Sequence, residues 1–155
     1  MPVNFLNGVQ RASYGRYVGA PSAEDRTRYF HLDDAERALI SQKRGDHNRL
    51  GFALQLTTVR FLGTFLEDPT AVPPVIVQFV ADQCNITDSA CLLDYRETPQ
   101  RWAHTVEIRT QYGYREFADP IARFRLTRWL YALCWTGTER PRRTFRACHD
   151  LAPRA

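Results

Sequence analysis

The chain has 155 residues, 44% of them hydrophobic and 25% charged, a composition that predicts a folded chain and excludes an intrinsically disordered one. Its formal net charge is +4, and every basic residue except Lys43 is arginine, whose planar guanidinium suits phosphate and carboxylate groups. Because no run of eighteen apolar residues and no segment resembling a signal peptide occurs, we expect a cytoplasmic protein with no membrane partner.

The first thirty residues are expected to hold two short helices. Ser22 is the predicted N-cap of the second helix, since Asp25 follows at capping-box spacing. Asp33 and Glu36 then predict a capping box that opens the next helix, and we expect Gly45 to end that helix in a left-handed conformation.

A long helix is expected from about residue 46 to residue 61, followed by a loop over 67–74 that prolines close. Pro73 and Pro74 predict the start of another helix, because proline is tolerated in the first helical turn. Thr87 or Asp88 opens a short helix that ends near residue 95.

Two further helices begin with a capping residue followed by proline. Thr98 and Pro99 open the first, which Gly113 ends, and Asp119 and Pro120 open the second. Strand-like alternation is rare, so the sequence predicts an all-α, multi-helix bundle of seven or eight helices. Two small helix-turn-helix-like subdomains, with a boundary near 67–74, are the alternative arrangement.

The long helix from residue 46 carries apolar side chains on two flanks, which predicts that it is largely buried. Arg60 falls among them, so we expect it to reach solvent or to pair with a buried acid. Gly51, Gln55 and Thr58 form a narrow stripe of small, neutral positions. That stripe would let another backbone approach closely, either of protein or of DNA.

Charge is distributed unevenly along the chain. Residues 1–95 carry nine basic and eleven acidic side chains, whereas residues 96–155 carry twelve basic and six acidic ones. A polyanionic partner would therefore be attracted toward the second part. A solvated basic surface with no partner explains the same distribution equally well.

The first candidate DNA contacts lie in the turn before the long helix, and they are Lys43, Arg44 and Arg49. Arg49 stands at the helix start, where its charge opposes the helix dipole unless an anion is near. We therefore expect Arg49→Ala to cost more DNA affinity than stability, and Arg60→Ala to do the reverse.

The second group lies on the helix from Thr98 and in the turn that follows. Arg101 and His104 share a helical face, while Trp102, Val106 and Ile108 are expected to pack inward. The other members combine arginine with tyrosine, which suits phosphates and sugars, and they are Arg109, Tyr112, Tyr114 and Arg115. A tyrosine-rich turn that only caps a core is the alternative.

The third group, Arg125 and Arg128, forms a polar stripe on the last helix, which would contact either DNA or solvent.

No catalytic residue is predicted, because the chain has no Walker A loop, no G-x-S-x-G and no H-E-x-x-H. The four cysteines form no C-x-x-C pair and no zinc-site spacing with histidine. We therefore expect reduced, mostly buried thiols, no metal and no cofactor.

Three blocks of the sequence carry a resemblance to a known family. They read RYFHLDDAERALISQKRGDHNRLGFALQLTTVRFLGTFLED, VPPVIVQFVADQCNI and DYRETPQRWAHTVEIRTQYGYREF. In this order and spacing, from about Pro2 to Trp135, they resemble the N-terminal region of class II replicative transposon transposases, the family of the ampicillin-resistance transposon Tn-three. The motifs with most weight are RLGFALQL and the set Arg101, His104, Ile108, Tyr112, Gly113, Tyr114, Arg115 and Phe117.

The resemblance implies that residues 1–137 are an all-helical region that binds double-stranded DNA at the terminal inverted repeats of a transposon. In that family the catalytic acidic triad, which holds two metal ions, lies far downstream. The implied role is therefore recognition of transposon ends without enzymatic activity.

The likeness fades near Thr138, and we interpret the basic tail over 138–155 as a truncation or frameshift remnant. An alternative role is that of a protein-interaction fragment, which would join a full-length transposase and block it through exposed Trp129 and Trp135. An inert relic is the remaining alternative.

Overall fold

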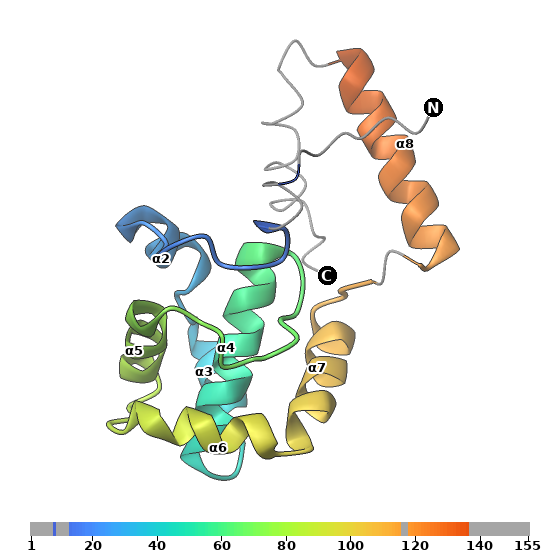
Figure 1. Ribbon diagram of the computed structural model, residues 1–155. Coiled ribbons are helices and arrows are strands. Elements are labelled where there is room, and N and C mark those ends of the chain that lie inside the picture. Colours follow the sequence, from blue (N-terminus) through green and yellow to red (C-terminus); the bar gives the residue numbers. More distant parts are fainter. Residues whose placement is uncertain (1–7, 9–12, 116–117, 137–155) are drawn as a thin grey trace. The chain divides into compact units, whose positions relative to one another are not determined.

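The structure is a computed structural model, and it describes residue 8, residues 13–115 and residues 118–136 (Figure 1). Within these residues the chain forms α-helices and one 3-10 helix and no strand, so the predicted all-α, multi-helix fold is confirmed. The chain divides into two compact units, Met1–Thr105 and Val106–Ala155, and the segment 67–74 lies within the first.

The helices follow one another along the chain in the order α2 (Ala23–Tyr29), α3 (Asp34–Ser41), α4 (Asp46–Leu62), α5 (Pro74–Gln83), η1 (Ser89–Cys91), α6 (Leu92–Glu97), α7 (Gln100–Gln111) and α8 (Pro120–Thr136). Ser22 accepts the backbone N–H of Asp25, and Asp33 and Glu36 form a capping box, as predicted. The other helix expected in the first thirty residues falls largely outside the described residues.

Gly45 does not end α3, so that prediction is wrong. The helix ends at Ser41, four residues earlier, and a turn closed by the Lys43 N–H on the Ile40 carbonyl follows it. Gly45 has a φ of 84° and is the N-cap of α4. Its left-handed φ therefore turns the chain into the next helix rather than out of the previous one.

Helix α4 is the centre of the first unit, and α2, α3, α5 and α6 pack around it (Figure 1). All ten residues from Leu50 to Val59 are buried, as the two apolar flanks predict. Gly63, with a φ of 77°, ends α4 in the left-handed conformation that glycine adopts without strain.

The stripe of Gly51, Gln55 and Thr58 on α4 is covered by other segments of the chain. At Gly51 the Tyr95 ring lies so close that an added Cβ would stand 2.3 Å from its Cδ1. Gln55 donates from Nε2 to the Tyr95 hydroxyl at 2.9 Å and to the Arg101 carbonyl at 3.1 Å. Thr58 shares a 2.8 Å hydrogen bond with the Tyr17 hydroxyl. The close approach that the stripe allows is therefore made by α6, the start of α7 and the segment before α2.

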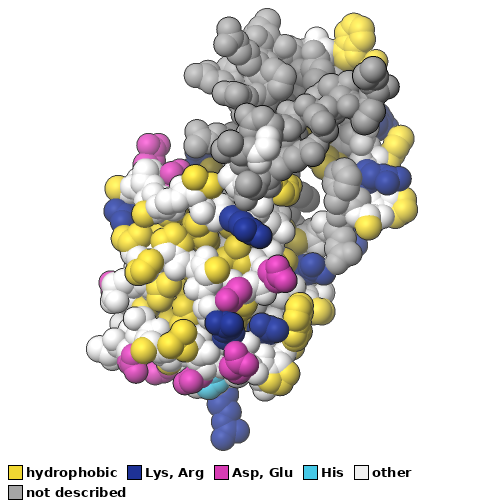
Figure 2. Space-filling view, viewed as in Figure 1, with side chains coloured by type: hydrophobic (Ala, Val, Ile, Leu, Met, Phe, Trp, Pro, Cys, Tyr) yellow, Lys and Arg dark blue, Asp and Glu magenta, His cyan; other side chains and the backbone are white. Residues whose placement is uncertain are grey.

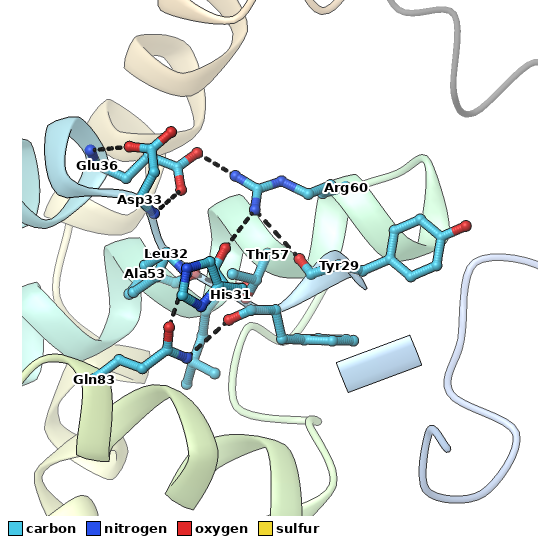
Figure 3. Close-up of polar contacts among 11 residues, drawn as sticks. Tyr29, His31, Leu32, Asp33, Glu36, Ala53, Thr57, Arg60 and Gln83 are labelled. Atoms are coloured by element: carbon cyan, nitrogen blue, oxygen red, sulfur yellow. Dashed lines mark hydrogen bonds and ion pairs between the residues drawn. The ribbon is translucent and has the colours of Figure 1, made fainter. Parts of the chain in front are cut away.

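Arg60 pairs with a buried acid, which confirms the role expected from the helical faces. Figure 3 shows Arg60 and Glu36 joined beside the segment that connects α2 to α3. Arg60 also donates to the backbone carbonyl of His31 at 2.9 Å. From α5, Gln83 accepts the Leu32 N–H at 2.8 Å and donates to the Phe30 carbonyl at 2.9 Å. The connecting segment is thereby held by side chains from two helices.

The inward face of α7 differs from the prediction. Trp102 and Val106 were expected inside, but their exposed fractions are 63% and 61%, so this expectation is wrong. Ile108 is buried as predicted, and His104 is buried in addition. Polar bonds account for this rotation of α7. The buried His104 ring pairs with the Tyr95 hydroxyl, and the Arg101 carbonyl accepts from Gln55, so buried polar groups are satisfied that hydrophobicity alone does not take into account.

Gly51→Ala should lower the free energy of unfolding by about 1–3 kcal/mol, the usual cost of overpacking, although alanine favours a helix interior. The physical cause is the fully buried Tyr95 ring, whose Cδ1 would stand 2.3 Å from the added Cβ. Urea unfolding followed by circular dichroism measures the change. A variant as stable as the parent chain would show that this contact is looser than described.

Arg60→Ala should lower the free energy of unfolding by about 2–3 kcal/mol, less than a fully buried pair costs, because a quarter of the Arg60 side chain is exposed. The loss comes mainly from leaving the Glu36 carboxylate buried without its partner. The double variant Arg60→Ala/Glu36→Gln should recover part of it in the same urea titration. A double variant less stable than Arg60→Ala would contradict this cause.

Candidate nucleic-acid interface

The turn between α3 and α4 presents the first group of predicted DNA contacts. Arg44 is exposed, and its carbonyl accepts the side-chain amide of Asn48. Lys43 is half-buried, with its Nζ 4.5 Å from the centroid of the Phe52 ring. α4 begins beside them with no side-chain cap. An exposed cation next to uncapped backbone N–H groups is an arrangement suited to phosphate.

Arg49 has partners inside the first unit. Its Nη1 donates to Asp46 at 3.0 Å and its Nη2 to the Cys84 carbonyl at 2.9 Å, at the C-terminal end of α5. A cation at a helix C-terminus is favourable, so α5 and Asp46 supply the negative charge that the start of α4 does not. Arg49 therefore joins two helices, a role that its sequence position did not reveal.

Two members of the second group, His104 and Arg101, differ in how far they are buried. His104 is buried, and its Nδ1 lies 2.8 Å from the Tyr95 hydroxyl. The Tyr95 hydroxyl also accepts from Gln55, and burial raises its pKa well above the usual range. Arg101 is half-buried, and its guanidinium lies 4.9 Å from the centroid of the exposed Trp102 ring. Only Arg101 of this pair reaches the surface.

A groove of about 900 Å³ lies on the first unit. Its lining is mixed in charge and comprises Tyr14, Gly15, Arg16, Tyr17, Thr64, Phe65, Leu66, Glu67, Asp68, Ala71, Arg96, Glu97 and Arg101. Figure 2 shows basic and acidic side chains gathered in the middle of the face turned to the reader. We call it the arginine groove, after Arg16, Arg96 and Arg101.

Both walls of the arginine groove are fastened to α4. On one side, the ring of Tyr17 stacks on Phe61 with centroids 5.9 Å apart, and burial raises its pKa to about 12, so its hydroxyl stays protonated beside Thr58. On the other side, Gln55 holds the carbonyl of Arg101. The groove is therefore formed by the packing of the unit and not by a loose loop.

Sequence reasoning named Arg101 but missed Arg16 and Arg96. Arg16 stands between Tyr14 and Tyr17, the same mixture of arginine and tyrosine that singled out residues 109–115. The same arginine–tyrosine pattern could therefore have indicated Arg16 from the sequence. Arg96 carried no local signal, because only the fold brings it beside Asp68, at 3.8 Å.

The second unit holds the remaining predicted contacts. Gly113 has a φ of 67° and turns the chain after α7, with Arg115 exposed and Arg109, Tyr112 and Tyr114 half-buried around it. On α8, Arg125 and Arg128 are exposed and line a shallow hollow with Phe124 and Trp129. Residues 138–155, the predicted basic tail, lie outside the described residues.

The described residues contain no cluster of three or more histidine, cysteine or acidic side chains that could hold a metal ion. None of their helices combines the length and the hydropathy that a membrane span requires. Cys84 is buried and Cys91 half-buried, both are free thiols, and burial raises the pKa of each. The side chains of Cys134 and Cys148 are outside the described residues.

Comparison with known proteins gives a family match over nearly the whole chain. The model described as "Domain of unknown function (DUF4158)" matches residues 5–151. The chain is 51% identical over 143 residues to the transposase for transposon gamma-delta of Escherichia coli (strain K12), covering 91% of this chain and 14% of that relative. It is 40% identical over 90 residues to the transposase for transposon Tn501 of Pseudomonas aeruginosa, covering 57% and 9%.

A third relative, the transposase for transposon Tn3926 of Escherichia coli, is 34% identical over 116 residues, which cover 74% of this chain and 11% of the relative. The chain thus spans a small part of the length of each of these relatives.

Arg49→Ala should lower the free energy of unfolding by about 1–3 kcal/mol, the cost of losing hydrogen bonds from a charged group. Arg44→Ala removes the same charge from an exposed side chain and should change stability by less than about 0.5 kcal/mol. Thermal unfolding of the two variants, side by side, measures the difference. Equal stabilities would mean that the Arg49 contacts contribute nothing, and the original expectation for Arg49 would stand.

Proposed function

The chain belongs to the DUF4158 family and is homologous to Tn3-family transposases, and on that premise we propose that it is a DNA-binding region that recognises the terminal inverted repeats of a transposon. The resemblance predicted from the three sequence blocks is confirmed by these matches. The observation that carries the proposal is the identity of 51% over 91% of the chain to a transposase.

The proposal assigns end recognition to this chain and catalysis to other parts of the transposases. The chain spans 14% or less of each of the relatives described. No catalytic set is predicted from its sequence, and the acidic triad of the family is expected elsewhere. DNA recognition is a task that a basic, all-α region of this size performs in many proteins.

The proposed DNA contacts are the predicted residues that reach the surface. In the first unit they are the exposed Arg44 and the half-buried Lys43 and Arg101. In the second unit the proposed contacts are Arg109, Tyr112, Tyr114, Arg115, Arg125 and Arg128. His104 and Arg49 have internal partners, so we propose that they support the interface and do not touch the DNA.

A second function is favoured by one feature of α8. Four large side chains of this helix, Ile121, Phe124, Tyr131 and Trp135, have exposed fractions between 62 and 76%. They are separated by three, seven and four residues, which places them along one side of the helix, as in a helix-pairing seam. Contact with a full-length transposase is the alternative role that this seam supports.

Purified chain titrated with a fluorescent duplex of the inverted repeat should bind it at least about a thousandfold more tightly than a scrambled duplex, the lower end of the usual range of specific over non-specific binding. Fluorescence anisotropy at several salt concentrations measures both affinities. Equal and weak binding to the two duplexes would remove the recognition of transposon ends. Co-purification with full-length transposase, without DNA binding, would favour the second function instead.

Arg44→Ala provides the residue-level test in the same titration. Loss of the Arg44 side chain should weaken binding to both duplexes and reduce the slope of log affinity against log salt by about 0.9, the value of one phosphate contact. Arg37→Ala is the matched control, since Arg37 pairs with Asp34 on α3 and carries the same charge. Equal effects of the two substitutions would assign the change to net charge alone.

A further inference from the structure

The charges of the arginine groove are not equivalent. Arg96 lies 3.8 Å from Asp68 and 3.6 Å from Glu97, so its charge is offset by two carboxylates. The hydroxyl of Thr70 donates to Asp68 at 2.6 Å and, with Arg96 and Arg101 nearby, holds the pKa of that carboxyl below its usual value. Arg96 is therefore already paired with two carboxylates, those of Asp68 and Glu97.

Arg16 and Arg101 differ from Arg96 in their ion pairing. Neither makes an ion pair with a carboxylate among the described residues, although both line the groove. Arg16 is exposed beside the exposed ring of Tyr14, and Arg101 is stacked on Trp102. Two guanidinium groups that line one groove therefore have their fork of donors available for an anion. Such forks bind phosphate in a bidentate manner.

The walls hold these two arginines in place. Gly15 has a φ of 70°, and a Cβ there would stand 3.0 Å from the methyl group of Thr64, so the Tyr14–Tyr17 turn lies directly on the end of α4. The opposite wall is fixed by the Gln55 bond to the Arg101 carbonyl. Because the arginine backbones are fixed by packing, little ordering is needed when an anion binds.

We infer that the arginine groove holds the sugar–phosphate backbone of one DNA strand, with Arg16 and Arg101 as the phosphate contacts. This inference rests on the proposed function and extends it to a surface that includes Arg16, Tyr14 and Tyr17. A duplex is too wide to enter a groove of about 900 Å³, but the ridge of one backbone strand fits such a recess. Contacts of this kind set the position of a protein on DNA and do not read bases.

Glu67 provides a second test of the inference, in which the expected change in DNA affinity has the opposite sign. It lines the groove, it is exposed, and it makes no ion pair among the described residues. A phosphate strand in the groove is repelled by this carboxylate. Removing its charge therefore strengthens binding if the strand lies here, and has no effect if the strand lies elsewhere.

The experiment titrates the full chain with the inverted-repeat duplex and a scrambled duplex, at about 50 to 200 mM salt, by fluorescence anisotropy. Arg16→Ala and Arg101→Ala are each expected to weaken binding to both duplexes about tenfold, the loss of one charged hydrogen-bonding group. Each is also expected to lower the salt slope by about 0.9. Glu67→Gln is expected to tighten binding about two- to threefold, and Arg37→Ala is the charge-matched control.

The outcomes separate the two proposals. If the wild-type chain binds neither duplex, the proposed function fails and the groove inference falls with it. If the wild-type chain binds, but Arg16→Ala and Arg101→Ala keep the affinity and salt slope of Arg37→Ala, only the groove inference is overturned. Circular dichroism confirms that the variants are folded, and neither substitution removes the Arg101 carbonyl on which Gln55 depends.

Discussion

The first unit depends on the way α4 is held through one narrow stripe of its surface. Gly51, Gln55 and Thr58 are small or amide-bearing residues in a helix that is otherwise apolar. Gly51 admits the Tyr95 ring, Gln55 bonds to both α6 and α7, and Thr58 bonds to Tyr17. Buried polar groups that are fully paired specify one arrangement of their neighbours, because any other leaves donors or acceptors unsatisfied. The walls of the arginine groove are positioned by this stripe.

The same principle separates the arginines of the first unit into two kinds. Arg60 is bonded to Glu36 and to the His31 carbonyl, and Arg49 is bonded to the Cys84 carbonyl. Both arginines thereby connect α4 to neighbouring segments of the first unit. Arg16, Arg44 and Arg101 lie at the surface with no carboxylate partner among the described residues. A basic composition alone does not distinguish these kinds. Contacts do, and they leave the surface arginines available for the DNA contacts that we propose.

Much of the helical framework could be predicted from the sequence because its signals are local. Caps at Ser22 and Asp33 and the prolines at the start of α5 and α8 act within a few residues, as does the apolar pattern of α4. The pairing of Arg60 with an acid followed from the face on which it lies. Gly45 was misplaced because a left-handed glycine serves equally well after one helix and before the next.

The candidate site was predicted less well, since it depends on contacts between distant residues. The inward face of α7 is set by polar bonds and not by the hydrophobicity of Trp102 and Val106. His104 bonds to Tyr95, nine residues away, and Gln55 bonds to the Arg101 carbonyl, forty-six residues away. Similarly, Arg49 is bonded to a carbonyl thirty-five residues away. No helical wheel contains that information.

The central claim, that surface arginines meet DNA while bonded arginines hold the fold, is tested most directly by NMR spectra of the arginine side-chain N–H groups. The chain, labelled with ¹⁵N, would be titrated with the inverted-repeat duplex. The account predicts that the signals of Arg16, Arg44 and Arg101 shift while those of Arg49 and Arg60 stay in place. Shifts confined to Arg49 and Arg60, or no shift at Arg16, Arg44 and Arg101 when DNA is bound, would contradict it.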